Sequence, residues 1–294
     1  MGRYVFGTSV QGASHIRVGR PCQDNSTFRD RNFTYPKKKS KTNDLYAGLD
    51  EDILILSVAD GHGSDSCPFS QTGSAIAINV FCDLMAEFCL KYKDTMESLR
   101  TYFNREADTR IAKAIDSEWK KRVLNQHKLK MAKENQPLVF ESEKDKEAIY
   151  KMYGTTLLGV VITKEFSFVF QLGDGDISYV DATGVKPVLE AEKILGVETH
   201  SLSKKDAWKN ALTRVINRET EEQTPFMYML TTDGMANSYI SEGEFHKSCQ
   251  EYFDMIREHG GKVVEENLPG WLSETSAMGC GDDISAVIAY YDET

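Results

Sequence analysis

Apolar runs with an aspartate just after or just before them recur along this chain, and they constrain its fold more than any other feature. The runs are short and rich in β-branched and aromatic residues, which is typical of β-strands. Four of them carry the pattern, at residues 53–59, 166–172, 226–231 and 284–291. The aspartates at their ends are Asp60, Asp174, Asp233 and Asp282. Each aspartate alone is typical of a turn, so only their joint occurrence is informative.

The four aspartates can meet at one edge of a sheet if the first three strands run one way and the fourth runs antiparallel to them. Unpaired carboxylates repel one another, so such a cluster needs cations. Carboxylate oxygens, with a backbone carbonyl and water, are the ligands that Mg²⁺ and Mn²⁺ prefer. Two such ions can activate a water and hold a phosphoryl group during in-line displacement. The pattern therefore predicts metal-dependent phosphate chemistry that needs no nucleophilic side chain.

Further strands and several long helices complete the predicted architecture. Additional strands are expected at residues 4–10, 155–162 and 177–180. Helices are expected at residues 69–92, 96–126, 204–218 and 241–259. The alternating phenylalanines of the strand 166–172 indicate that one of its faces is buried. Strands interleaved with long helices, without a steady β-α-β alternation, indicate an α+β fold with antiparallel sheets.

Length and polarity predict how the domain is organised. With 294 residues and 40% hydrophobic content, the chain is expected to form one large domain over residues 1–294. Two polar segments, at residues 29–52 and 120–151, are expected to be surface insertions. We interpret them as a solvated loop and a charged helix end in preference to a dedicated binding patch.

Charge and cysteine content disfavour several other functions. Asp and Glu outnumber Lys and Arg by 45 to 35, and the net charge of −10 disfavours nucleic acid as a partner. The six cysteines form no C-x-x-C pair and none precedes an arginine by six positions, which disfavours zinc and cysteine-based phosphatase chemistry. No segment has the apolar length of a signal peptide or a membrane span, so we expect a cytoplasmic protein without membrane association.

Seven short motifs follow one another in order over most of the chain. They are Gly12 with Cys22-Gln23-Asp24, Asp60-Gly61-His62-Gly63, Gly154-Thr155-Thr156, Gly173-Asp174, Ala211-Leu212-Thr213-Arg214, Thr232-Asp233-Gly234 and Gly281-Asp282-Asp283. This ordered set resembles the protein phosphatase 2C family of metal-dependent serine/threonine phosphatases, in a variant similar to its bacterial branch. The resemblance implies a central β-sandwich of two antiparallel sheets flanked by α-helices, a four-layer αββα arrangement with the metal site at one end.

The resemblance also implies roles for the metal-binding residues. Asp60 would bridge two Mg²⁺ or Mn²⁺ ions, and the Gly61 carbonyl would bind one of them. Asp233 and Asp282 would bind the other ion. Asp174 would complete a third site, shared with Asp233. A hydroxide bridging the two ions would attack the phosphorus of phosphoserine or phosphothreonine in line, without a phosphoenzyme intermediate.

Two further roles lie outside the direct metal ligands. Asp24 would act through metal-bound water. His62 occupies the position proposed in the family as general acid to the leaving alkoxide, and it directly follows the motif residues Asp60 and Gly61. For an isolated histidine a structural role is the safer interpretation, but this placement favours a catalytic one.

Three positions depart from the family pattern. Gln23 stands where members usually carry Glu, and Asp283 stands where Asn is common, so the net charge near the ions is similar. The third departure is Gly19, at the position of the family's phosphate-binding arginine. Its neighbours Arg17 and Arg20 are the candidates to replace that arginine. Arg17 is preferred because Arg20 adjoins a proline in an expected turn, and the choice between them stays open.

Substrates and alternatives follow from the same resemblance. A flap that selects substrates is implied within residues 185–207. The implied partners are phosphorylated proteins, on which the chain would act as a monomer and oppose a serine/threonine kinase.

One alternative is a pseudophosphatase, which binds phosphoproteins without turnover and would be expected to lack a metal aspartate. Another is a phosphoesterase for nucleotides or nucleic acid, which the net charge of −10 disfavours.

Overall fold

The computed structural model describes residues 2–35, 43–135, 142–189 and 199–292. Within these residues, ten strands form two five-stranded antiparallel sheets. The first sheet, in spatial order, consists of β1 (Gly2–Val10), β10 (Ile284–Asp292), β9 (Phe226–Thr231), β6 (Asp176–Asp181) and β7 (Gly184–Pro187). The second consists of β2 (Asn25–Arg29), β3 (Leu54–Ala59), β4 (Leu157–Ile162), β5 (Phe166–Leu172) and β8 (Leu212–Asn217).

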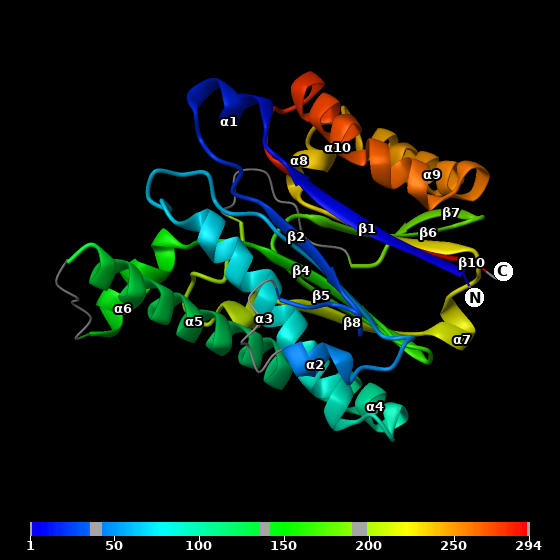
Figure 1. Cartoon of the computed structure of the whole chain (residues 1–294), viewed down its shortest axis with the longest axis horizontal. Helices are drawn as coiled ribbons and strands as arrows, with labels where there is room; N and C mark the ends of the chain where they lie inside the picture. The colour runs from blue at the N-terminus through cyan, green and yellow to red at the C-terminus, as the bar shows by residue number, and fades with distance from the viewer. Residues whose placement is uncertain (1, 36–42, 136–141, 190–198, 293–294) are drawn as a thin grey trace.

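Helices cover the outer face of each sheet, as Figure 1 shows. The first sheet is covered by α9 (Glu242–His259) and α10 (Gly261–Met278). The second is covered by α2 (Asn43–Ala47), α3 (Ser70–Lys91), α4 (Met96–Glu106), α5 (Ala112–Lys133) and α6 (Glu143–Met152), with a π-helical turn at Ala107–Ile111. The short helices α1 (Ala13–Val18), α7 (Arg218–Glu221) and α8 (Asp233–Ala236), with a 3-10 turn at Ala207–Asn210, complete the set. The predicted four-layer α+β sandwich is confirmed.

Three hydrophobic clusters hold the layers together. The inner faces of the two sheets meet in one cluster, which includes Leu56, Val160, Leu230 and Val287. The helix layer on the second sheet packs through a cluster that includes Phe81, Trp119 and Phe168. The helix layer on the first sheet packs through a third, which includes Phe253, Leu268 and Ile288. Each sheet is therefore buried on both faces.

The strand 166–172 corrects one prediction. All seven residues of β5 are buried, whereas the alternation of phenylalanines predicted only one buried face. Phe168 and Phe170 point into the helix-side cluster, and Val169 points into the cluster between the sheets. The helix layer that covers the outer face of the second sheet explains the difference, because it removes the solvent that a two-layer sheet would face.

The segment 204–218 corrects another prediction. In place of a helix, it forms the 3-10 turn and then β8, which pairs with β5 from Phe166–Asn217 to Gln171–Leu212. Its β-branched residues Thr213, Val215 and Ile216 fit a strand, and the open edge of β5 supplies the backbone partners. This long-range pairing overrides the weak helical pattern. Strands β2 and β7 and helix α10 were also not predicted.

Parts of the two predicted insertions and of the predicted flap are described. Residues 43–47 form α2, whereas residues 36–42 of the segment 29–52 lie outside the described residues. The segment 120–151 consists largely of α5 and α6, and its residues 136–141 lie outside the description. The flap prediction covers β7 and residues 199–207, and its residues 190–198 again lie outside. The insertion and flap roles stay predictions.

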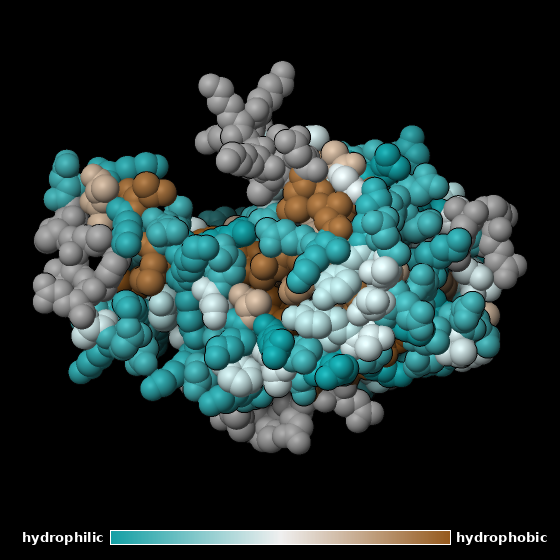
Figure 2. Space-filling model, turned by 90° about the horizontal axis from the view of Figure 1, so that it is seen from below, coloured by the Kyte–Doolittle hydropathy of each residue, from teal (hydrophilic) through white to brown (hydrophobic). Residues whose placement is uncertain are grey.

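Helix α3 is long and apolar enough to cross a membrane by length and composition alone. It is the one helix of this kind in the described part of the chain, and 61% of its apolar window is buried inside the protein. Figure 2 shows the molecule from the side of the helices that cover the second sheet, and this face is largely hydrophilic. These features match a core helix packed between a sheet and a second helix layer.

Strand directions decide where the four aspartates emerge. Both β3 and β5 are antiparallel to β4, so they are parallel to each other, and Asp60 and Asp174 follow at the same end. Strand β10 is antiparallel to β9, so Asp233 after β9 and Asp282 before β10 also share one end. The structure places both pairs at the same end of the sandwich, as the sequence predicts.

Candidate metal centre

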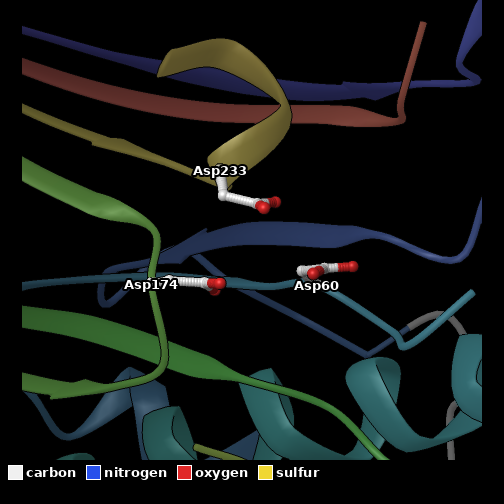
Figure 3. Close-up of side chains that lie close together, drawn as sticks. All are labelled: Asp60, Asp174 and Asp233. Carbon is white, nitrogen blue, oxygen red and sulfur yellow. The ribbon is translucent and has the colours of Figure 1, made fainter. Parts of the chain in front are cut away.

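Three of the predicted metal ligands converge at this end of the sandwich. One carboxylate oxygen from each of Asp60, Asp174 and Asp233 lies within 4.8 Å of the other two. Figure 3 shows the three side chains directed toward a shared space from three segments of the chain. Asp60 follows β3, Asp174 lies between β5 and β6, and Asp233 begins α8. The group therefore draws on both sheets.

The Gly154-Thr155-Thr156 motif fixes the backbone of Asp60. The amide of Thr156 donates a hydrogen bond of 2.9 Å to the Asp60 carbonyl, and the Thr155 hydroxyl donates one of 2.7 Å to the same oxygen. In return, the Asp60 amide donates to Thr156 Oγ1 at 2.9 Å. The motif thus holds the strand end from which the Asp60 carboxylate projects, a role that the sequence pattern did not reveal.

Gly61 lies where no side chain fits. A Cβ at this position would lie 2.6 Å from the Gln23 carbonyl oxygen and 2.9 Å from that of Ser70. Both neighbours are backbone atoms, so neither can move aside without shifting a segment. Glycine is required by this close approach of three backbones, and the predicted use of its carbonyl as a metal ligand stays a prediction.

Asp174 is oriented by a residue that no sequence motif indicates. The Thr199 hydroxyl donates a hydrogen bond of 2.6 Å to Asp174 Oδ2. The preceding Gly173 has φ of 121°, and a Cβ there would lie 2.6 Å from Cβ of Thr156. The turn that carries Asp174 therefore packs directly on the motif that holds Asp60.

Asp233 is positioned through contacts with the start of β10. The residue before it is Thr232, whose hydroxyl accepts a hydrogen bond of 2.8 Å from the Ser285 amide. The Thr232 amide donates a hydrogen bond of 3.1 Å to the Ser285 carbonyl. A Cβ on Gly234 would lie only 2.1 Å from the Asp283 carbonyl oxygen. The Asn237 side chain donates to Asp233 Oδ2 at 3.0 Å. These contacts with β10 and the hydrogen bond from Asn237 hold the Asp233 carboxylate in place.

Asp24 is buried beside the cluster. Its Oδ2 accepts a hydrogen bond of 2.6 Å from the Thr232 hydroxyl. Burial raises the pKa of Asp24 to about 8; the Thr232 hydrogen bond opposes this rise, while the charges of Asp283 and Asp233 add to it. Burial also raises the pKa of Asp60 well above its usual value, with the charges of Asp24 and Asp233 adding to the effect. A divalent cation would stabilise the charged forms and displace these protons.

Asp282 and Asp283 are adjacent in sequence but differ in burial and in their contacts. The Asp282 side chain is 53% exposed, and its Oδ1 lies 3.7 Å from His15 Nε2. It is not one of the three converging carboxylates, although its charge contributes to the raised pKa of Asp60. Asp283 is buried and accepts hydrogen bonds of 2.7 Å from the amides of Gly12 and Gln23. The sequence suggested Asp283 only as a replacement charge, and its anchoring role appears only in the structure.

The donor set fits a hard divalent cation. In the described part of the chain, the converging group contains carboxylates and neither histidine nor cysteine. Oxygen donors alone suit Mg²⁺ or Mn²⁺, whereas zinc sites typically include sulfur or nitrogen ligands. Burial, together with the charges of neighbouring carboxylates, raises the pKa of both Asp24 and Asp60. A bound cation would supply compensating positive charge.

His62 lines a cavity of about 580 Å³ next to the cluster. Thr199, which bonds Asp174, lines the same cavity. The imidazole packs over Gly154, where a Cβ would lie 2.6 Å from its Cδ2 atom. His62 is therefore placed at the border between the carboxylates and an open space, and its acid role stays a prediction.

Of the two candidate arginines, Arg20 reaches the loop after β3. Its Nη1 donates a hydrogen bond to the Gly63 carbonyl, and its Nη2 lies 3.3 Å from Asp65 Oδ1. Arg17 is exposed on α1. Gly19, with φ of 68°, ends α1 and turns the chain so that Arg20 faces this loop. Of the two, Arg20 therefore contacts the loop after Asp60, and the assignment of either arginine to phosphate binding stays a prediction.

A helix-covered double sheet with an oxygen-only acidic centre at one end defines a class of metal-dependent phosphatases. The family described as Protein phosphatase 2C matches residues 11–273. The chain belongs to this family, as its ordered motifs indicated. No curated protein matches the chain in a comparison of sequences.

Solved bacterial phosphatases share this fold. The serine/threonine phosphatase of S. agalactiae is 12% identical with a TM-score of 0.59, and the match covers 99% of this chain and 100% of that one. PstP/Ppp of Mycobacterium tuberculosis is 12% identical with a TM-score of 0.57, and both chains are covered completely. The catalytic domain of PstP in complex with two manganese ions is 12% identical with a TM-score of 0.55, and 99% of each chain is covered. At these identities the likeness concerns the fold.

Proposed function

We propose that this protein is an active phosphatase that removes phosphate from phosphoserine and phosphothreonine on other proteins, using two Mg²⁺ or Mn²⁺ ions. The convergence of Asp60, Asp174 and Asp233 within 4.8 Å carries the proposal. The fold relative PstP was solved with two manganese ions, which supports a two-ion centre. Bound ions would activate a water and neutralise the phosphoryl oxygens.

The aspartates would divide the metal binding between them. Asp60 would contact both ions, because its carboxylate lies near those of both Asp174 and Asp233 and its backbone is held at the end of β3 by Thr155 and Thr156. Asp282 would join Asp233 from the exposed rim of the site. Asp174, oriented by a hydroxyl, would complete a third site. Asp24, which is buried, would hold water that binds an ion.

His62 would donate a proton to the leaving alkoxide. Its ring lines the cavity where the rest of the substrate would lie, and it follows the metal ligands Asp60 and Gly61 directly in sequence. An acid placed next to the leaving oxygen lowers the barrier by stabilising the departing charge. Arg20 would bind the phosphoryl group through its guanidinium, which lies against the adjacent Gly63 carbonyl.

Release of phosphate from a phosphothreonine peptide tests this function. With Mn²⁺ the protein should release phosphate, and chelation or Asp233→Asn should reduce the rate by at least about a hundredfold, because the charge-neutralising ion would be lost. Asp254→Asn, at an exposed ion pair with Arg257 on α9, is a matched control that should retain the wild-type rate. Full activity after chelation would exclude the metal mechanism.

The regulatory alternative makes a different prediction. A pseudophosphatase would bind phosphoproteins without turnover, and its metal site would be expected to lack an aspartate. Asp60, Asp233 and Asp282 are all present, and two of them converge. Metal-loaded protein that binds a phosphopeptide but releases no phosphate would favour this alternative.

Cellular context is proposed from sequence features alone. We propose a cytoplasmic, monomeric protein that opposes a serine/threonine kinase and does not bind nucleic acid or membranes. The net charge of −10 supports the absence of nucleic-acid binding. Size-exclusion chromatography with light scattering tests the monomer, and phosphoproteomics of cells that lack the protein tests the substrates and their kinase.

A further inference from the structure

The cavity next to the metal centre carries an unusual charge for this protein. Three of its lining residues are lysines, namely Lys151, Lys204 and Lys205, and Glu147 is the acidic residue in its lining. The whole chain carries a net charge of −10, so a local excess of lysine stands out from the average surface. Serine and threonine hydroxyls contribute further hydrogen-bond donors to the lining.

The cavity borders the carboxylate cluster through shared residues. Thr199 lines the cavity, and its hydroxyl donates a hydrogen bond to Asp174. His62, also in the lining, lies two positions after Asp60. A group bound among the lysines would therefore lie next to a phosphoryl group held at the metal centre.

One wall of the cavity is fixed to the strand end that carries Asp60. The Thr155 amide donates a hydrogen bond of 3.1 Å to Ser201 Oγ, and the Thr155 carbonyl accepts one of 3.0 Å from the Leu202 amide. Lys204 lies two positions after Leu202, and its carbonyl accepts a hydrogen bond of 2.9 Å from Lys120 Nζ. Since Thr155 also bonds the Asp60 carbonyl, this wall and the metal centre share one rigid support.

A second part of the lining comes from the end of α6. Lys151 lies in the last turn of this helix, and its carbonyl accepts a hydrogen bond of 3.2 Å from the Gly154 amide. A lysine at a helix end is also explained by the helix dipole, so Lys151 alone would carry no argument. Its convergence with Lys204 and Lys205, from a segment about fifty residues away, is what concentrates positive charge in one cavity.

We propose that this cavity binds an anionic side chain, a carboxylate or a second phosphoryl group, close in sequence to the phosphorylated residue of the substrate. The inference rests on the proposed phosphatase function and adds a substrate preference to it. Ammonium groups and hydroxyls recognise both kinds of anion by charge-assisted hydrogen bonds. The lysines would also offset the repulsion between an acidic substrate segment and the acidic enzyme.

Matched phosphothreonine peptides test the preference. The peptides differ at the positions that flank the phosphothreonine, which carry glutamate, glutamine, lysine or a non-hydrolysable phosphonate. We expect kcat/KM for the glutamate peptide to exceed that for the glutamine peptide by about three- to tenfold at low salt. The lysine peptide should be poorer still, and the preference should shrink at high ionic strength because salt screens exposed charges. The glutamate and phosphonate peptides distinguish the two sources of the anion.

Charge-reversal variants locate the preference in the cavity. Lys151→Glu and Lys205→Glu should each lower the glutamate-to-lysine ratio of kcat/KM by about threefold or more. The ratio compares two peptides on the same protein, so changes in folding or metal content cancel. Lys247→Glu, on α9 over the first sheet, makes the same charge change away from the cavity and should keep the wild-type ratio.

Hydrolysis of p-nitrophenyl phosphate distinguishes a failure of the anion-binding inference from a failure of the proposed phosphatase function. If this small ester is hydrolysed with Mn²⁺ but the peptides react equally, the anion-binding inference is wrong and the phosphatase function stands. The inference is also wrong if Lys151→Glu and Lys205→Glu both keep the wild-type preference for the glutamate peptide over the lysine peptide. If neither the ester nor any peptide is hydrolysed, the proposed function fails and the inference fails with it.

Discussion

His15 Nδ1 lies 2.9 Å from Oδ1 of Asp283, a carboxylate whose side chain is only 2% exposed. The same carboxylate accepts backbone hydrogen bonds from Gly12 and Gln23, which lie 271 and 260 positions away in the chain. One buried side chain therefore joins the N-terminal segment that leads to Asp24 with the start of β10. The two ends of the sequence meet at the metal centre through this carboxylate.

The anchoring role of Asp283 predicts a graded loss of stability. Asp283→Ala should lower the free energy of unfolding by about 2–4 kcal/mol, because two buried backbone amides lose their acceptor. Asp283→Asn keeps one acceptor oxygen and should lower it by less. Urea unfolding in the presence of Mn²⁺ measures both. Asp254→Ala at an exposed ion pair should change the free energy by less than about 1 kcal/mol; equal losses for the two Asp283 variants would contradict the anchoring role.

The two arginines predict different kinetic effects. Arg20→Ala should raise KM for a phosphothreonine peptide by about tenfold, because a charge-assisted hydrogen bond to phosphate contributes on the order of 1–3 kcal/mol. Arg17→Ala, at an exposed position on α1, should leave KM within about twofold of wild type. Steady-state kinetics on both variants decides between them, and an effect confined to Arg17→Ala would reverse the assignment.

The raised pKa of Asp24 predicts how stability depends on pH without metal. Because folding raises this pKa from 3.8 to about 8, the folded state binds more protons than the unfolded state between these values. The contribution of Asp24 to stability is therefore lost as pH rises through this range, by up to about 1.4 kcal/mol per pH unit.

Urea unfolding in a chelator at several pH values between about 5 and 8 measures this dependence. Asp24→Asn has no such titration, so its free energy of unfolding should fall less steeply with pH than that of the wild type. Saturating Mn²⁺ should also weaken the dependence in the wild type, because the ion favours the charged carboxylates. Equal slopes for wild type and Asp24→Asn would refute the prediction.

The close packing at Gly61 predicts a strong effect of a single methyl group. Gly61→Ala places a Cβ within 3 Å of two backbone oxygens, so the segment that carries Asp60 must shift. We expect Mn²⁺-dependent activity to fall by at least about tenfold, because displaced ligands bind the ion less well. Gly270→Ala within α10 is the matched control: its Cβ meets no atom within 4 Å, and activity should be unchanged. Wild-type activity in Gly61→Ala would show that the segment tolerates the shift.

Local patterns in the sequence determined most strands and the presence of the aspartates. The residues of β5 and β9 are mostly apolar or aromatic, and their bounds at Phe166–Leu172 and Phe226–Thr231 match the predicted ranges. The sequence also placed Asp60, Asp174 and Asp233 within two residues of a strand end, because an adjacent Asp and Gly mark a turn in each case. Such signals depend on neighbours in the chain and need no tertiary contact.

Only the tertiary structure decided which side chains meet. Strand β8 forms because the edge of β5 is available, and no local pattern reports that edge. Arg20 faces Gly63 because the turn at Gly19 sets its direction, and Thr199 reaches Asp174 across 25 positions of sequence. These contacts join distant segments whose geometry is fixed by sheet register and packing. The sequence by itself therefore determined which carboxylates border the strands, while the assembled sandwich decided how they converge and formed the lysine-lined cavity beside them.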